Sequence, residues 1–165
     1  MKRRTFVTAT AAAAISVGAT ARDSRAATAA SSTEVSTDLA EQQRLLVLAH
    51  EARRNAYSKY SNFQVGAALL ANDGTVITGC NVENASYGLT ICAERTAVFK
   101  AVSMGYRPGD FRAIAVAASA DGFSPCGACR QVLAEFGENI NVIFEHKNQP
   151  VAKTVEELLP YRFKL

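Results

Sequence analysis

The sequence has 165 residues, of which 48% are hydrophobic and 20% are charged, and its formal net charge is +3. This length and composition predict one globular domain with a short additional segment. Of 18 basic and 15 acidic residues, five basic and one acidic lie within residues 1–30, which leaves 13 and 14. This near-neutral remainder argues against nucleic acid as a partner, because phosphate binding needs concentrated positive charge. No apolar run reaches the roughly 18 residues that a membrane-spanning helix needs.

Residues 1–30 are predicted to be a leader and not part of the domain. They start with basic residues that include the adjacent Arg3 and Arg4, continue with a weakly apolar stretch and end in small residues. This pattern is typical of a secretory signal, and the paired arginines favour the twin-arginine class and hence export. An organellar transit peptide and a disordered extension of a cytoplasmic protein remain alternatives. Residues 31–36 are predicted to be a polar linker, and 37–165 a single domain.

The domain is predicted to begin with an amphipathic helix that runs to about Asn55. Asp38, with Glu41 three residues later, is typical of a capped helix start. The apolar residues at helical spacing are Leu39, Leu45, Leu46, Leu48, Ala49, Ala52 and Ala56. His50 lies in this helix, and we expect it to be packed or half exposed and not to bind a metal.

A β-hairpin and a series of alternating elements are predicted to follow. The hairpin consists of strands at 63–71 and 75–80 around the Asn-Asp-Gly turn at 72–74. The later elements are a helix at 92–104, a strand at 111–118, a helix at 125–136 that Pro125 opens, a strand at 141–145 and a short helix from Thr154 that Pro160 stops. This order predicts an α/β fold, namely a three-layer α/β/α sandwich with a mixed, roughly five-stranded sheet.

Three cysteines and one glutamate indicate a metal centre. Cys92 precedes Glu94 by two residues, and Cys126 and Cys129 follow about thirty residues later as Pro-Cys-Gly-Ala-Cys. Three protein ligands leave tetrahedral zinc with an open position, which is the catalytic arrangement and not the structural one. Zinc held by such a set beside a glutamate that is not a ligand is the signature of zinc-dependent base deaminases. The sequence therefore predicts one Zn²⁺ per chain.

The positions of these residues also suggest how the centre works. Both cysteine groups lie at predicted helix starts, where free N–H groups and the helix dipole stabilise thiolates. Three thiolates around Zn²⁺ carry excess negative charge, and Arg95 is predicted to compensate for it. Glu94 is predicted to act as a general acid–base group that moves a proton from a zinc-activated water. The implied reaction is attack of that water on an amidine-like carbon with loss of ammonia.

Other interpretations of the cysteines remain open at this point. Cys80 could complete a structural four-cysteine zinc site, although its place in a strand makes this awkward. Two disulfides would suit an exported chain with four cysteines. A thioredoxin-like redox pair at Cys126 and Cys129 would explain neither Cys92 nor Glu94. The default for Cys80 is a buried and inert thiol.

From about Leu39 to the C-terminus, the sequence resembles the small three-cysteine cytidine deaminases. The segments that carry the resemblance are Tyr60-Ser-Asn-Phe-Gln-Val-Gly-Ala-Ala-Leu69, Gly79-Cys-Asn-Val-Glu-Asn-Ala-Ser-Tyr87, Cys92-Ala-Glu-Arg95, Pro125-Cys-Gly-Ala-Cys-Arg-Gln131 and Glu157-Leu-Leu-Pro160. The resemblance implies that Cys92, Cys126 and Cys129 bind zinc. It also implies that Glu94 carries a proton to ring N3 of the pyrimidine and then to the leaving ammonia.

The resemblance further implies a nucleoside substrate and a shared active site. Asn81 and Glu83 would hold the ribose 3′-hydroxyl as donor and acceptor, and Phe63 would pack against the nucleoside. The resemblance to relatives of this short form implies a homotetramer, in which Ala85 and Tyr87 of one subunit reach the pocket of a neighbouring subunit. Phe163 resembles the C-terminal aromatic residue that closes that site, although this chain ends two residues later.

The implied activity is hydrolytic deamination of cytidine and deoxycytidine in pyrimidine salvage. Deamination of a cytosine-containing antibiotic such as blasticidin is the nearest alternative, since it would use the same zinc ligands. A polynucleotide-editing deaminase would need a basic track that the near-neutral domain lacks. A zinc-stabilised binding module would keep the cysteines but would have no use for Glu94.

Replacing Arg3 and Arg4 by lysine tests the leader prediction. A folded reporter fused to residues 1–30 should leave the cytoplasm with the native pair and stay inside with the lysine pair, because twin-arginine recognition depends on both arginines. Cell fractionation measures the difference. Equal export of both fusions would contradict the prediction.

Overall fold

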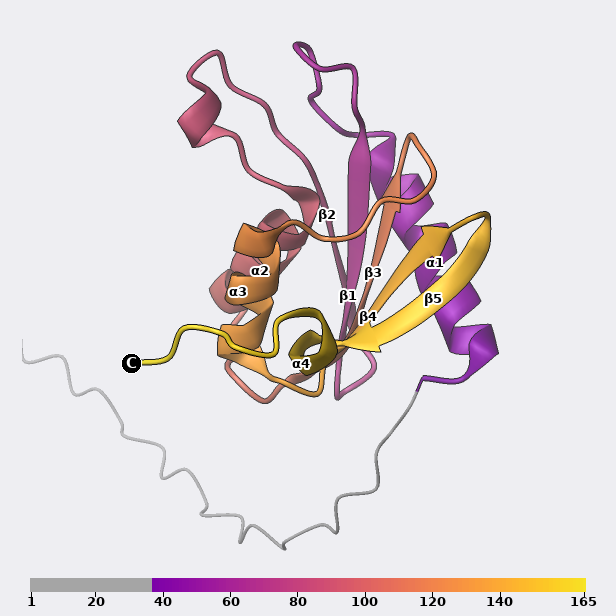
Figure 1. Cartoon of the computed structure of the whole chain (residues 1–165), viewed down its shortest axis with the longest axis vertical. Coiled ribbons are helices and arrows are strands. Elements are labelled where there is room, and N and C mark those ends of the chain that lie inside the picture. Colours follow the sequence, from indigo (N-terminus) through magenta and orange to yellow (C-terminus); the bar gives the residue numbers. More distant parts are fainter. Residues whose placement is uncertain (1–36) are drawn as a thin grey trace, which may run out of the picture. The chain divides into compact units, whose positions relative to one another are not determined.

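A five-stranded mixed sheet forms the centre of the protein, of which the computed structural model describes residues 37–165 (Figure 1). In chain order the elements are α1 (Leu39–Arg53), β1 (Val65–Ala71), β2 (Val76–Cys80), the 3₁₀ turn η1 (Tyr87–Leu89), α2 (Ala93–Ser103), β3 (Phe111–Ala118), α3 (Gly127–Phe136), β4 (Asn141–His146), β5 (Gln149–Thr154) and α4 (Val155–Leu158). The predicted leader at 1–30 and linker at 31–36 lie outside the described residues. No helix among residues 37–165 has the length and apolar character needed to cross a membrane.

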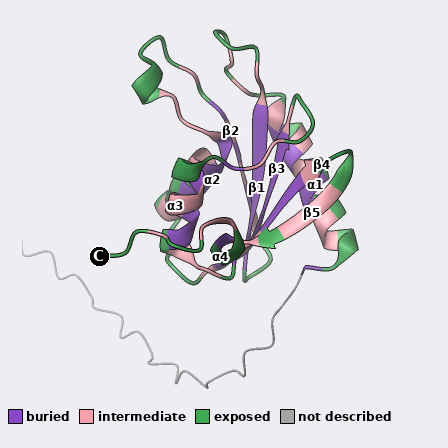
Figure 2. Cartoon of the chain, viewed as in Figure 1, coloured by how far each residue is buried: buried purple, intermediate pink, exposed green. Residues whose placement is uncertain are grey.

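The strand order is β2-β1-β3-β4-β5, with β3 and β4 parallel and the other neighbours antiparallel. β1 is buried along its whole length and β3 nearly so, and the buried colour of Figure 2 is concentrated in these central strands. Strands buried on both faces need cover on both sides. The predicted α/β fold with a mixed five-stranded sheet is confirmed.

Two separate apolar cores lie on the two faces of the sheet, because successive strand residues point to opposite sides. On one face α1 packs through Leu45, Leu46 and Ala49 against Ala68 and Leu70 of β1. On the other face α2 and α3 pack against the alternate strand residues, with Ala93, Ala97, Val98, Leu133, Leu69 and Val116 among the buried members. The three layers of the predicted sandwich follow from this alternation.

Two glycines let the helices approach the sheet closely. A Cβ on Gly66 would lie 2.0 Å from the Ala49 carbonyl oxygen of α1. A Cβ on Gly79 would lie 2.5 Å from the Ala97 amide nitrogen and 2.6 Å from the Ala93 carbonyl oxygen of α2. Real Cβ atoms do not tolerate such contacts with backbone. Gly79 therefore sets the depth at which the first turns of α2 sit against the sheet.

Helix capping follows the prediction at both ends of the domain. The Asp38 side chain accepts a hydrogen bond from the Glu41 amide at 2.7 Å and caps α1. Thr154 and Glu157 form a reciprocal capping box at the start of α4. His50 of α1 is half exposed, and its Nε2 lies 2.9 Å from Glu145 Oε2 on β4.

Four sequence-based expectations need correction. Leu39 is 68% exposed, because it lies in the first turn of α1, well before the first buried residue, Leu45. Pro125 precedes α3 and does not open it, since Cys126 is the N-cap. β1 begins at Val65 and not at Phe63, because side chains hold the backbone of Phe63.

The fourth correction is strand β5, which the sequence did not predict. It forms a hairpin with β4 through Lys147 and Asn148, both with positive φ, at 54° and 57°. Two consecutive positive φ values are the requirement of a type I′ turn, which normally favours Asn-Gly. This edge strand was not predicted because Lys-Asn is not the favoured turn pair and because Pro150, near the strand's start, is unusual within a strand.

The sheet register brings three distant segments to one edge. Cys80 at the end of β2 pairs with Gly66 near the start of β1, and Ala118 at the end of β3 pairs with Val65. The chain entering β1, the chain leaving β2 and the chain leaving β3 therefore meet at this edge. In Figure 1 the loops that enter β1 and leave β2 project from it, and most of their residues are exposed in Figure 2.

Candidate metal centre and active site

Two helices present three cysteine sulfurs to one point. Cys92 is the N-cap of α2, Cys126 is the N-cap of α3, and Cys129 lies in the first turn of α3. Their Sγ atoms all lie within 4.8 Å of one another. The N-cap positions follow from the extended backbone of both cysteines, with ψ near 160°. The helix starts thus aim N–H groups and positive dipole ends at the sulfurs.

The donor set fits zinc of the catalytic kind. Three thiolates are ligands that Zn²⁺ prefers, and they leave a fourth tetrahedral position for water or substrate. Glu94 is 1% exposed beside this cluster, and neither of its carboxylate oxygens has a hydrogen-bond partner among the described residues. A buried carboxylate without a partner is costly unless something at the site uses it. Glu94 therefore points to a bound group that the protein chain does not itself provide.

Charge around the sulfurs is arranged to favour thiolate at Cys92. Arg95 Nη2 donates to Cys92 Sγ at 3.5 Å and to the Thr90 carbonyl at 3.3 Å. Hydrogen bonding from the Cys129 thiol, followed by the Arg95 guanidinium, lowers the pKa of Cys92. The same pairing, together with burial, raises the pKa of Cys129. One guanidinium thus lies where the negative charge of the ligand set accumulates.

The pKa of the neighbouring Glu94 carboxyl group is raised, and burial is the main cause. The pKa of Glu94 rises to about 7, with the negative charge of Cys92 as an additional cause. A carboxyl group with a pKa near neutrality can both accept and release a proton at working pH. Glu94 does not belong to the sulfur cluster that could hold the metal.

The alternatives based on four cysteines disagree with the structure. All four thiols are free, and Cys126 Sγ lies 3.6 Å from Cys129 Sγ, too far for a disulfide. Cys80 is outside the cluster at the end of β2, where its thiol donates to the Asn55 carbonyl at 3.4 Å. It is partly exposed and not buried, because the strand ends there, and desolvation raises its pKa.

The residues expected to contact the nucleoside sugar lie together at the same edge of the sheet. Asn81 is buried, its Oδ1 accepts from the Val65 amide at 2.8 Å, and its Nδ2 donates to the Phe63 carbonyl at 2.9 Å. Glu83 accepts hydrogen bonds from the loop before β1, including the Tyr60 amide at 2.7 Å. The Phe63 ring is half-buried and packs against Phe123, with ring centroids 5.4 Å apart.

Ala85 and Tyr87 lie farther out, in the loop between β2 and α2. Both are exposed, and Tyr87 begins η1 with 79% of its surface accessible. In a single chain neither is packed against the cysteine cluster.

The C-terminal segment is fastened to α3 by residues that the sequence did not single out. Gln131 Nε2 donates to the Phe163 carbonyl at 3.1 Å, and the Phe163 amide donates to Gln131 Oε1 at 3.3 Å. Arg130 Nη1 donates to the Leu158 carbonyl at 2.9 Å and Nε to the Pro125 carbonyl at 2.7 Å. Arg130 and Gln131 directly follow Cys129, and this closeness to a predicted zinc ligand was the sequence signal that could have identified them. The Phe163 side chain itself remains 68% exposed.

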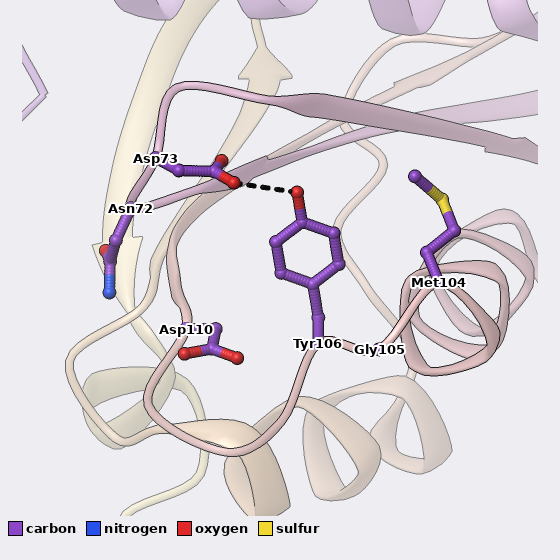
Figure 3. A pocket seen from close by; sticks show the side chains of 6 residues that line it. All are labelled: Asn72, Asp73, Met104, Gly105, Tyr106 and Asp110. Atoms are coloured by element: carbon purple, nitrogen blue, oxygen red, sulfur yellow. Dashed lines mark hydrogen bonds between the residues drawn. The ribbon is translucent and has the colours of Figure 1, made fainter. Parts of the chain in front are cut away.

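A cavity of about 470 Å³ lies at the other end of α2 and is not a candidate for this chemistry. It is lined by Asn72, Asp73, Met104, Gly105, Tyr106 and Asp110 (Figure 3). Tyr106 Oη donates to Asp73 Oδ2 at 2.9 Å, and the Arg107 amide donates to Asp110 Oδ2 at 2.7 Å. Met104 is the C-cap of α2 and Cys92 its N-cap, so the cavity is about 18 Å along the helix axis from Cys92.

The fold and the site together define a zinc-dependent deaminase. The family model for the cytidine and deoxycytidylate deaminase zinc-binding region matches residues 39–145. The chain belongs to this family, and its metal is zinc.

Individual relatives agree with this assignment. The chain is 53% identical over 126 residues to the cytidine deaminase of Halalkalibacterium halodurans, covering 74% of this chain and 94% of that protein. A crystal structure of cytidine deaminase from Burkholderia pseudomallei matches with a TM-score of 0.71 and 51% identity, covering 73% of this chain and 98% of that one. The blasticidin-S deaminase of Bacillus cereus is 32% identical over 108 residues, covering 60% of this chain and 76% of that protein.

Two serine substitutions separate the ligand cysteines from Cys80. Purified Cys80→Ser protein should contain one zinc per chain, because Cys80 lies outside the sulfur cluster. Cys129→Ser should lose most of its zinc on dialysis, because a hydroxyl is a far poorer ligand than a thiolate. Elemental analysis of the metal measures both. Loss of zinc from the Cys80 variant would contradict the assignment.

Proposed function

We propose that the protein hydrolyses cytidine and deoxycytidine to uridine and deoxyuridine with release of ammonia, a reaction of pyrimidine salvage. The observation that carries this proposal is the buried carboxylate of Glu94, which has no hydrogen-bond partner within residues 37–165 and lies beside three converging sulfurs. A structural zinc site has no need of such a group. Family membership and the identity to curated cytidine deaminases support the same activity.

Cys92, Cys126 and Cys129 would hold the zinc. When bound, zinc would act as a Lewis acid and lower the pKa of a coordinated water. Arg95 offsets part of the negative charge of the three thiolates through its contact with Cys92.

Glu94 moves the protons of the reaction. It takes a proton from the attacking water and delivers it to ring N3 as the oxygen adds to C4. It then takes the second proton from the hydroxyl group now on C4 and gives it to the C4 amino group. The C4–N bond breaks, ammonia leaves and C4 becomes a carbonyl, so both protons of the added water are accounted for. Glu94 is 1% exposed, which keeps its carboxyl group away from bulk solvent, so the transfer occurs between fixed partners.

The sugar end of the substrate is assigned to Asn81 and Glu83. Both side chains lie at the sheet edge that also carries the cysteine helices, and together they offer an N–H donor and a carboxylate acceptor to one hydroxyl. Phe63 would pack against the nucleoside. These assignments favour a ribosyl substrate over a blasticidin-type antibiotic, and the lower identity to the blasticidin-S deaminase points the same way.

We also propose that four chains share their active sites. Large apolar side chains are exposed on the two projecting loops, namely Tyr57, Tyr60, Val82, Tyr87 and Leu89. Tyr57 and Val82 are neighbours through a β-bridge, and exposed apolar surface of this kind supports an association site. Ala85 and Tyr87 would then reach a neighbouring pocket, and Phe163, which its backbone pairing with Gln131 presents outward, would help to close it.

Replacing Glu94 by glutamine tests the mechanism. The variant should keep one zinc per chain and lose about 10²- to 10⁴-fold in kcat, because the amide cannot carry the proton. Ammonia release from cytidine, deoxycytidine and blasticidin measures activity and substrate choice together. Substantial turnover by the variant would refute the role of Glu94, and turnover of blasticidin alone by the native protein would refute the substrate.

Mixing two defective variants tests the shared site. Tyr87→Ala should lower kcat/KM about tenfold or more, because it removes a contact that a neighbour provides. Co-expression with Glu94→Gln should restore activity, because some sites then combine an intact Glu94 with an intact Tyr87. Light scattering should give the mass of four chains. Activity no greater than the mean of the two parents would show that each site is built from one chain.

A further inference from the structure

The hydroxyl of Ser61 lies between two residues assigned to the nucleoside. Ser61 Oγ donates to Glu83 Oε1 and accepts a hydrogen bond from the Phe63 amide at 3.0 Å. The Ser61 amide adds a second contact to the same carboxylate, at 3.2 Å to Oε2. One side chain thus connects the expected acceptor for the sugar hydroxyl with the backbone of the expected aromatic contact.

The loop that carries Ser61 is fixed on both sides. The Tyr57 amide donates to the Asn81 carbonyl at 3.0 Å, and the Glu83 amide donates to the Tyr57 carbonyl at 2.8 Å. Asn62 has a φ of 58° and donates through its amide to the Ser58 carbonyl at 2.9 Å. Asparagine is among the few residues that adopt this left-handed conformation readily. The turn therefore holds Ser61 within hydrogen-bond distance of Glu83.

Counting hydrogen-bond positions shows what remains for a ligand. The Glu83 carboxylate has about four acceptor positions, and Tyr60, Ser61 N–H and Ser61 Oγ occupy three. The Ser61 hydroxyl, followed by the Tyr60 amide, lowers the pKa of Glu83, so it remains an ionised acceptor. Asn81 uses one of its two N–H groups on the Phe63 carbonyl. Within residues 37–165, one acceptor position of Glu83 and one N–H donor of Asn81 therefore stay without a partner, which matches a single hydroxyl.

We propose that Ser61 is a positioning residue that orients the free acceptor of Glu83 and the backbone of Phe63 toward the nucleoside, and thereby enforces recognition of the sugar 3′-hydroxyl. This inference rests on the proposed function. Without the Ser61 hydroxyl, the remaining N–H contacts lie on Oε2 alone, so the carboxylate can turn about its side-chain axis. The Phe63 amide would lose its partner in the same step.

The test compares two nucleosides in Ser61→Ala and native zinc-loaded protein. Calorimetry measures the Kd of uridine, the product of the proposed reaction, and of 3′-deoxyuridine, which lacks the hydroxyl. We expect Ser61→Ala to weaken uridine binding about tenfold and 3′-deoxyuridine binding less than about twofold. A purely structural role would weaken both nucleosides equally, and that result would overturn the proposal. So would a native protein that binds uridine no better than 3′-deoxyuridine, or binds neither.

Three further variants serve as controls. Ser61→Thr keeps the hydroxyl and should restore the native preference between the two nucleosides. Ser61→Gly lacks the hydroxyl and repeats the test should Ser61→Ala be poorly folded. Ser103→Ala removes an exposed hydroxyl that donates to the Lys100 carbonyl at 2.6 Å at the far end of α2, and should change neither Kd. Cytidine turnover by the native protein is assayed separately, so binding with native selectivity but no turnover would refute only the proposed function.

Discussion

The close approach of two helix starts, within 4.8 Å between sulfurs, is the constraint on which the rest of this structure depends. Three thiolates repel one another unless positive charge surrounds them, and here the dipoles of α2 and α3 and the Arg95 guanidinium provide it. The same arrangement places Glu94 in the first turn of α2, turned into the protein. Gly79 allows this, because any side chain at that strand position would push α2 away from the sheet.

A second network of hydrogen bonds organises the side of the protein at which we propose that the nucleoside sugar binds. Asn81, Ser61 and Glu83 join the chain entering β1 to the chain leaving β2, and their bonds end on the backbone of Phe63 and Val65. Most of the hydrogen-bonding capacity of these residues fixes the loop, and in the proposed site the remainder would bind the sugar hydroxyl. Preorganisation of this kind lowers the entropy cost of holding a small ligand.

The sequence predicted the elements that have strong local signals. The Asp38 cap, the Asn-Asp-Gly turn at 72–74 and the Thr154–Glu157 capping box are properties of a few neighbouring residues, and each is present as expected. Strand β5 was missed for two reasons. Lys147 and Asn148 are not the residues that usually form its type of turn, and its pairing with β4 cannot be read from the local sequence. Leu39 was wrongly assigned to the buried face, since helical spacing does not say where along a helix the sheet begins.

The sequence by itself determined the ligand chemistry of the site: three sulfurs at helix starts, an acid two residues after the first, and a family pattern around them. Spacing within a motif is local information, so it can be read from the sequence without a structure. Only the tertiary structure decided that Cys80 stays outside the cluster and that Glu94 is buried with no hydrogen-bond partner in the described part of the chain. It also decided that Ser61, Gln131 and Arg130 hold the loops and the C-terminal segment in place. Those facts depend on sheet register and on contacts between distant segments, which residue identity alone does not specify.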